Sequence, residues 1–225
     1  MNLEIYFDRY RAIVDQVDAV FKKVKEEHQE CVSCKVGCSD CCHALFDLTL
    51  IEALYIKNQF DKVFEKGDDR ALIIERANEA DRAVYRLKRQ AFKDHEDGKP
   101  ENEILEEMAT RRVRCPLLNA DDKCDMYADR PITCRLYGVP TVIGDKAHTC
   151  GMSGFEQGRS YPTVRLDAIQ HKLYELSMEL AKDIGSQYPK LAELLVPVSM
   201  ALLTEYTDEY LGVRPDAGQK DKREA

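Results

Sequence analysis

Five cysteines and a histidine fall within residues 31–43, which read CVSCKVGCSDCCH. A chain that concentrates thiols in this way must fold so that something holds them. The N-terminus carries acidic residues where a signal peptide would be basic, and no apolar run of signal length follows. We therefore expect a cytoplasmic protein whose nine cysteines are reduced, since disulfides are rare in that compartment. Clustered reduced thiols predict a metal site.

The spacing of these first cysteines is compatible with two backbone conformations. In one continuous helix all five would lie within an arc of about 100°. If Gly37 interrupts the helix, the segment becomes a metal-binding loop instead. In both cases the side chains of the adjacent Cys41 and Cys42 are expected to diverge and to serve two metals, or two irons of one cluster. A cysteine face packed into the core is the structural alternative.

A second group of cysteines lies in a segment rich in turns, residues 115–150, where prolines and glycines interrupt regular patterning. Its members are Cys115, Cys124, Cys134 and Cys150. The first group supplies Cys34, Cys38, Cys41 and Cys42. These eight candidate ligands suffice for two four-thiolate sites or for one cluster with spare thiols. Thiolates suit both zinc and iron–sulfur clusters, so the donor type does not choose between them.

Apolar residues recur at helical spacing over most of the chain. We expect helices over residues 3–28, 50–60 and 68–94, a short helical piece through Met108, and further helical segments at 164–184 and 191–211. Thr49 and Glu52 form a predicted capping box, and Gly144-Asp145 predicts a hairpin turn. The long helix can run out and return the chain, so the two cysteine groups are expected to meet.

This pattern predicts a mainly α protein. We expect one domain over residues 1–211, in which helices 3–28 and 164–211 enclose a loop-rich cysteine module at 31–150 with at most a short β-hairpin. A polar tail, 212–225, follows. The net charge of −8 argues against a nucleic-acid partner, and no apolar run is long enough to span a membrane. The expected partner is a protein or small-molecule substrate that the sequence does not identify.

Charged and imidazole side chains near the cysteines are further candidates. Arg130 and Arg135 flank Cys134, and a basic RRVR run precedes Cys115. Guanidinium groups could compensate the negative charge of a thiolate site or hold an anionic cofactor or substrate, although a turn or a solvated face explains them equally well. His43 and His148 rank behind the eight cysteines as ligands, because most single histidines bind no metal.

The cysteines and their neighbours resemble the CxxCxxCC family, also called YkgJ-type. The matching residues are Cys34-x3-Cys38-x2-Cys41-Cys42, Cys115-Pro116-Leu117 and Cys124-x2-Tyr127-x2-Arg130-Pro131-x2-Cys134-Arg135-x-Tyr137-Gly138. The resemblance implies a zinc- or iron-chelating domain with eight cysteines. One branch of that family includes flagellin lysine N-methylases, which are linked to an iron–sulfur cluster. Two departures are the first spacing, x3 where the family name has x2, and the ninth cysteine, Cys31, a spare or substitute ligand.

Three functions are consistent with these residues. The first is a metal-binding protein that carries an iron–sulfur cluster or zinc and acts in redox chemistry or in the modification of a protein or metabolite. The second is a non-catalytic zinc-stabilised interaction module. The third is a metal storage or delivery protein with labile thiolates. Dinucleotide-binding, P-loop, serine-hydrolase and zinc-protease motifs are absent from the sequence, and no catalytic residue is assigned.

Overall fold

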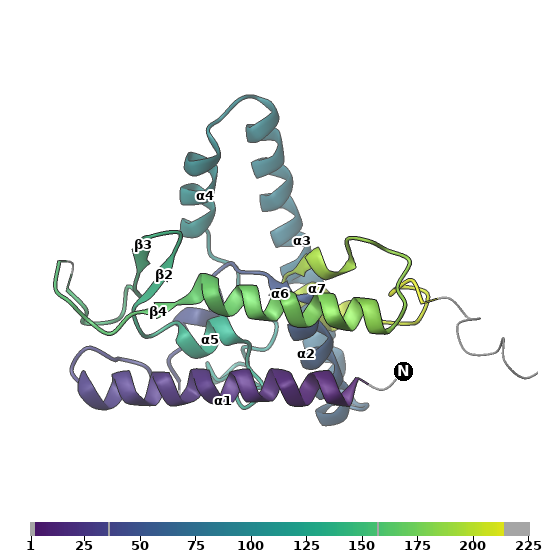
Figure 1. Ribbon diagram of the computed structural model, residues 1–225, viewed down its shortest axis with the longest axis horizontal. Coiled ribbons are helices and arrows are strands. Elements are labelled where there is room, and N and C mark those ends of the chain that lie inside the picture. Colours follow the sequence, from purple (N-terminus) through teal and green to yellow (C-terminus); the bar gives the residue numbers. More distant parts are fainter. Residues whose placement is uncertain (1–2, 36, 157, 214–225) are drawn as a thin grey trace, which may run out of the picture.

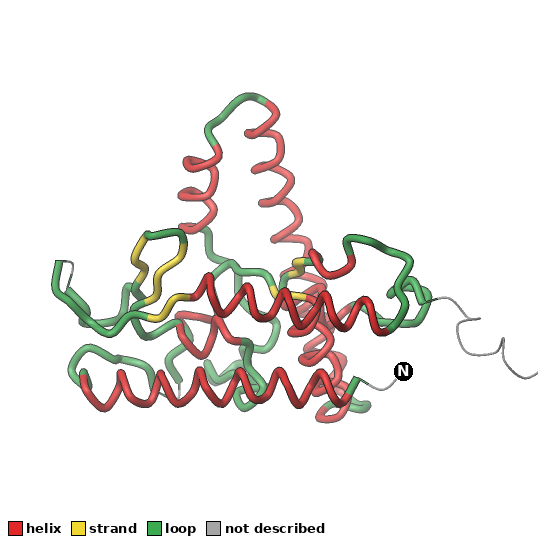
Figure 2. The backbone as a smooth tube through the Cα atoms, viewed as in Figure 1, coloured by secondary structure: helices red, strands yellow, loops and turns green. Residues whose placement is uncertain are grey.

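The computed structural model describes residues 3–35, 37–156 and 158–213. Its helices are α1 (Glu4–Glu27), α2 (Leu50–Val63), α3 (Asp68–Glu96), α4 (Glu101–Thr110), α5 (Ile132–Leu136), α6 (Leu166–Asp183) and α7 (Val198–Leu203), with two 3-10 turns, η1 (Asp40–His43) and η2 (Leu191–Glu193). Its strands are β1 (Leu48–Thr49), β2 (Thr141–Ile143), β3 (Lys146–His148), β4 (Val164–Arg165) and β5 (Leu195–Val196). The predicted mainly α class is confirmed, and Figure 2 shows long loops between the helices.

The strands are short and form two small groups. β2 and β3 make the predicted hairpin, whose turn residues Gly144 and Asp145 both have positive φ, as a tight turn of this kind requires. β4 joins β2 in parallel, and β1 pairs with β5 in antiparallel orientation. These last two pairings were not predicted, because two residues are too few to show an alternating pattern.

Helix α2 lies at the centre of the fold, and its residues 50–57 are all buried. Ile51 and Leu54 belong to a hydrophobic cluster shared with α1, α5 and α6. Ile56 and Phe60 belong to a second cluster shared with α3 and α7. One helix therefore joins the two parts of the core.

Helices α1 and α6 run side by side and antiparallel along one side of the molecule, with α5 packed against α1 (Figure 1). The hydroxyl of Tyr6 donates a hydrogen bond to Asp183, and Arg9 forms an ion pair with Glu179 at 2.5 Å. Both contacts join the start of α1 to the end of α6. Helix α5 packs against this two-helix layer.

Helices α3 and α4 form an arm that projects from the rest of the molecule (Figure 1). The first part of α3 packs on α7, with Ile73 and Ala77 buried. The second part leaves the body and packs against α4, where Ile104 is buried. We call α4 and the part of α3 from Arg82 onward the arm.

The predicted helical segment at 191–211 is wrong in its extent. Residues 191–203 form η2, β5 and the short helix α7, and turns follow to residue 211. Pro197 lacks an amide hydrogen and separates β5 from α7, which begins at the next residue. The other predicted helices are confirmed within a few residues of their expected ends. Most of the predicted polar tail lies outside the described residues.

The buried carboxylate of Glu52 connects α2 to α5. One of its oxygens accepts hydrogen bonds from the amide and hydroxyl of Thr49, at 3.2 and 3.0 Å, which completes the predicted capping box. The other accepts from the amide of Ile132 at 3.2 Å, at the first residue of α5. Burial raises the pKa of Glu52 above its usual value. The N-terminus of α5, which carries Cys134, is therefore fixed by a side chain of α2.

We predict that Glu52→Ala lowers the free energy of unfolding by about 2 kcal/mol, because half of the capping box is lost and the amide of Ile132 loses its acceptor. Urea denaturation measures this change. Glu75→Ala, at an exposed position of α3, is the matched control and should change stability by less than about 0.5 kcal/mol. Equal effects of the two substitutions would contradict the role given to Glu52.

Candidate metal centre

The first cysteine group lies on irregular backbone. Of the two predicted conformations, this is the loop and not the continuous helix. Apart from the 3-10 turn η1 at its end, the described part of residues 31–43 contains no helix. Gly37 has a φ of 89°, a conformation that side chains disfavour, and the amide of Cys38 donates to the carbonyl of Lys35 in the turn around it. The chain thus turns back between Cys34 and Cys38.

The second group is brought to the first by paired backbone. The amide of Val113 donates to the carbonyl of His43 at 3.0 Å, and the amide of Cys115 donates to the carbonyl of Cys42 at 2.7 Å. Ala44 and Arg112 form the neighbouring antiparallel bridge. These bonds set Cys115 directly beside Cys42, although about seventy residues separate the two positions in the chain.

A tight turn positions Cys124 near Cys115. The side-chain oxygen of Asn119 accepts hydrogen bonds from the amides of Asp121 and Lys123, each at 3.0 Å. Cys124 then forms an antiparallel bridge with Leu118. Local side-chain-to-backbone bonds of this kind stabilise a turn without regular secondary structure. The chain therefore reverses between these two cysteines.

Eight of the nine cysteines line one cavity of about 340 Å³, and all nine are free thiols. The lining cysteines are Cys34, Cys38, Cys41, Cys42, Cys115, Cys124, Cys134 and Cys150. Cys31 is buried elsewhere, with its thiol 3.6 Å from the carboxylate of Glu30. The expectation that the two cysteine groups meet is confirmed. Of the two roles expected for Cys31, spare or substitute ligand, its position outside the cavity favours the spare.

The eight thiols fall into two neighbouring sets, with Cys41 between them. The first set is Cys42, Cys115, Cys124 and Cys134. The second set is Cys34, Cys38 and Cys150. The thiol of Cys41 takes part in hydrogen bonds with Cys134 and Cys42, and it also interacts electrostatically with Cys34. The predicted divergence of Cys41 and Cys42 is wrong, because the thiols of these adjacent residues hydrogen-bond to each other.

Burial and thiol contacts set the protonation of these cysteines. Burial raises the pKa of Cys34 to about 11 and that of Cys115 to about 12. The hydrogen bond with Cys41, followed by burial, raises the pKa of Cys134. Hydrogen bonds from Cys134 and Cys42 lower the pKa of Cys41 to about 3. Cys41 is therefore the cavity cysteine that loses its proton most readily. The cysteines with raised pKa values need a cation nearby before they lose theirs.

The two predicted arginines have different surroundings. The guanidinium of Arg130 lies over the ring of Tyr127, 4.1 Å from its centroid, and its charge favours the thiolate of Cys41. Arg135 is buried, forms an ion pair with Asp18 at 2.5 Å and donates to two backbone carbonyls. Both line the cavity. Arg135 ties α5 to α1, and Arg130 is the one whose charge acts on a thiol.

A polar network that sequence reasoning missed lies behind Cys150. The thiol of Cys150 lies 3.4 Å from a carboxylate oxygen of Asp40, and Arg112 donates to that carboxylate and lies 3.4 Å from the hydroxyl of Tyr137. Against the effect of burial, these hydrogen bonds lower the pKa of Asp40. The sequence signal for this network was Asp40, which directly precedes the pair Cys41 and Cys42.

The predicted histidine candidates do not line the cavity. His43 makes a contact of 3.1 Å from its Nδ1 to the carbonyl of Ser39, and His148 is exposed on β3. Among the described residues, no three His, Cys, Asp or Glu side chains are arranged so that they could hold a metal ion as they stand. The thiol of Cys41 hydrogen-bonds to those of Cys134 and Cys42 instead.

Eight thiols around one cavity, on loops held by a helical body, define a cysteine-rich metal-chelating module. The comparison with protein families agrees: residues 30–151 match the family model CxxCxxCC, described as "Putative zinc- or iron-chelating domain". This match covers more than half of the chain, and the chain belongs to this family. No curated protein and no solved structure matches it. The link to flagellin lysine N-methylases stays a prediction.

In the described part of the chain, no helix is both long and apolar enough to cross a bilayer.

We predict that Gly138→Ala disturbs the cavity, because a Cβ at this position would lie 2.1 Å from the sulfur of Cys34. Displacing that side chain should lower the free energy of unfolding by about 1 to 3 kcal/mol and reduce the metal bound per chain. Gly151→Ala is the matched control, since nothing lies within 4 Å of the added atom. Urea denaturation and elemental analysis measure both effects. Indistinguishable variants would show that Gly138 does not constrain the site.

Proposed function

We propose that this protein binds an iron–sulfur cluster through its cavity cysteines and acts in redox chemistry or in the modification of a protein or metabolite. The observation that carries the proposal is the backbone pairing of Cys42 with Cys115, which gathers eight free thiols around one cavity. Iron–sulfur clusters are commonly held by four cysteine thiolates. When bound, such a group would supply electron transfer at a potential set by its surroundings.

The residues of the cavity fit this role in number and chemistry. The four thiols of the first set, Cys42, Cys115, Cys124 and Cys134, would be ligands of one site, and Cys34, Cys38 and Cys150 would be ligands of a second site. Cys41 lies beside both sets, where it can supply the fourth ligand of the second site or replace a ligand of the first. Its thiolate is already favoured, so it is the ligand that loses its proton at least cost.

Arg130 would balance part of the negative charge that thiolate ligands bring into the cavity. Its guanidinium is held over Tyr127 and donates to the carbonyl of the same residue at 2.8 Å, so its position is fixed before any metal binds. Arg135 contributes indirectly, because its contacts with Asp18 and with backbone carbonyls of the segment before α5 hold the helix that carries Cys134. A cation fixed beside thiolates also raises the reduction potential of the group they hold.

A second candidate function is a non-catalytic zinc module. One observation favours it: the segment between α4 and α5, which contains Cys115 and Cys124, has no helix or named strand among its described residues. Zinc held by thiolates from both groups would crosslink this segment to η1. The helices would then present a surface to another protein.

Protein purified without oxygen should be brown and contain iron and sulfide, with the broad visible absorption of thiolate-bound clusters. Elemental analysis combined with an absorption spectrum measures this directly. A colourless protein with stoichiometric zinc would refute the iron–sulfur proposal and support the zinc module. A protein that retains neither metal after anaerobic reconstitution with each would refute both.

Single cysteine substitutions test the arrangement of the ligands. Cys41→Ala should remove more metal per chain than Cys115→Ala or Cys34→Ala, because Cys41 lies between the two sets. Cys31→Ala is the matched control, since this thiol is buried outside the cavity. It should leave the metal content unchanged. The arrangement is wrong if Cys31→Ala loses as much metal as Cys41→Ala.

A further inference from the structure

The outer face of the arm has an unusual composition. Residues 82–93 of α3 read RAVYRLKRQAFK and include no acidic residue, although the chain has a net charge of −8. One side of this stretch carries four cations and two aromatic residues, which are Arg82, Tyr85, Arg86, Arg89, Phe92 and Lys93. At 100° per residue these six lie within an arc of about 120°, on the side away from the buried Val84. We call this surface the arm face.

The side chains of the arm face are not used by the fold. Tyr85 is 63% exposed and Phe92 is 61% exposed. Within residues 3–35, 37–156 and 158–213, none of the four cations forms an ion pair, and neither ring contacts another ring. Lys88, on the flank of the same helix, does form an ion pair, with Asp47 at 2.7 Å. Free cations and exposed rings therefore gather on one side of the arm.

Such a surface has the composition of a binding site for protein. Tyrosine, phenylalanine and arginine are enriched where proteins bind one another, whereas single exposed apolar residues are ordinary. Here two aromatic side chains one helical heptad apart are interleaved with three arginines and a lysine. Within residues 82–93 no acidic residue neutralises the four cations, and Glu96 shares their side of the helix only beyond the end of the face. The charge of the four cations is therefore available to a partner.

We propose that the arm face docks an acidic helical segment of a partner protein. From Arg82 to Lys93 the face is about 16 Å long at 1.5 Å per residue, which matches about three helical turns of a partner. Carboxylates on that segment would pair with the arginines, bidentately where the geometry permits. Leucine-like side chains between the carboxylates would cover Tyr85 and Phe92.

Other polyanions fit the arm less well. The second helix of the arm carries Glu101, Glu103, Glu106 and Glu107, so a nucleic acid longer than the face would run over an acidic surface. A helix that lies on a membrane separates its apolar face from its cationic face. On the arm face the aromatic and cationic side chains are interleaved. A short partner segment that carries both carboxylates and apolar side chains matches these interleaved cations and rings.

Fluorescence anisotropy with a labelled, helix-stabilised peptide that carries Glu and Leu on one face tests the proposal. We expect binding that weakens as salt is added. Arg86→Glu combined with Arg89→Glu and Lys93→Glu should weaken it about tenfold or more. Tyr85→Ser combined with Phe92→Ser should also weaken binding, and by an amount that salt does not change, because these residues supply apolar contact.

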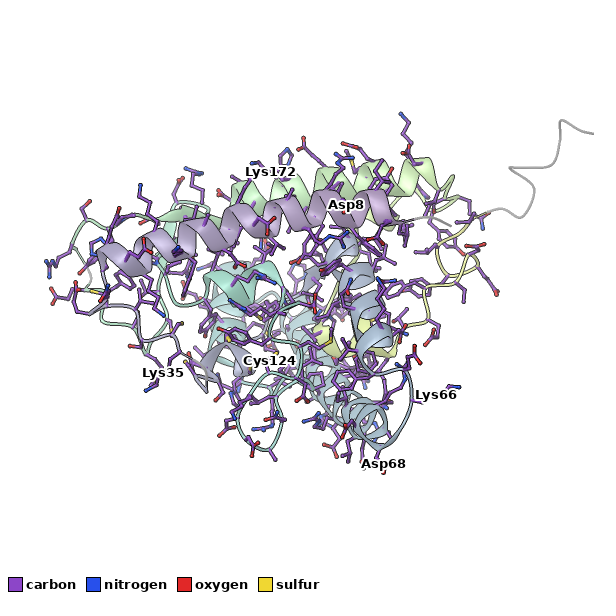
Figure 3. The ribbon with its side chains drawn as sticks, turned by 90° about the horizontal axis from the view of Figure 1, so that it is seen from below. Asp8, Lys35, Lys66, Asp68, Cys124 and Lys172 are labelled. Carbon is purple, nitrogen blue, oxygen red and sulfur yellow. The ribbon has the colours of Figure 1, made fainter. Side chains whose placement is uncertain are left out.

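The matched control reverses three exposed cations elsewhere, Lys22→Glu with Lys66→Glu and Lys172→Glu. Figure 3 shows Lys66 and Lys172 on different sides of the molecule. The control should bind the peptide as the unmodified chain does within about threefold, the residual effect of distant charge, and circular dichroism should show that all variants are folded. Absence of peptide binding, an equal loss in the control, or tighter binding to a single-stranded oligonucleotide or to anionic vesicles would overturn the proposal. None of these outcomes bears on metal content, which is measured separately.

Discussion

The backbone hydrogen bonds that join residues 42–43 to residues 113–115 bring the first cysteine group against the second. They close a loop that contains α2, α3 and α4, and the entropy lost on closing a loop grows only slowly with its length. Burial of α2 between two hydrophobic clusters offsets that loss. Packing of the helical body therefore helps to hold the two cysteine groups side by side.

The cavity combines eight thiols with charged side chains at its lining, Arg130 and Arg135 among them. Burial raises the pKa of most of them, while hydrogen bonds from its neighbours lower the pKa of Cys41. Protonated thiols can form part of a core, because they pack as small apolar groups. The cavity becomes strongly anionic only when a cation replaces the protons. The same residues can thus be part of a core and a set of ligands.

Periodicity and capping signals predicted α1, α2, α3 and the β2–β3 hairpin, because these elements depend on nearby residues. The meeting of the cysteine groups followed from their number and the direction of the helices between them. The role of Arg135 was not predictable, because its partner Asp18 lies on α1, and the contact of Asp40 with Cys150 likewise joins distant segments. A helix was predicted over residues 191–211 because the apolar residues there recur at helical spacing. Pro197, which ends regular pairing at that point, was given too little weight.

Helix α3 runs without a glycine or proline from Asp68 to Glu96. Sharp bends in helices occur mainly at such residues or at local insertions, so this one behaves as a stiff rod. Ala80 and Val84, at the level where the rod leaves the body, form part of the cavity wall. A force applied to the outer part of the arm cannot be absorbed by a hinge in α3. It must either bend a continuous helix or shift the wall against which the thiols lie.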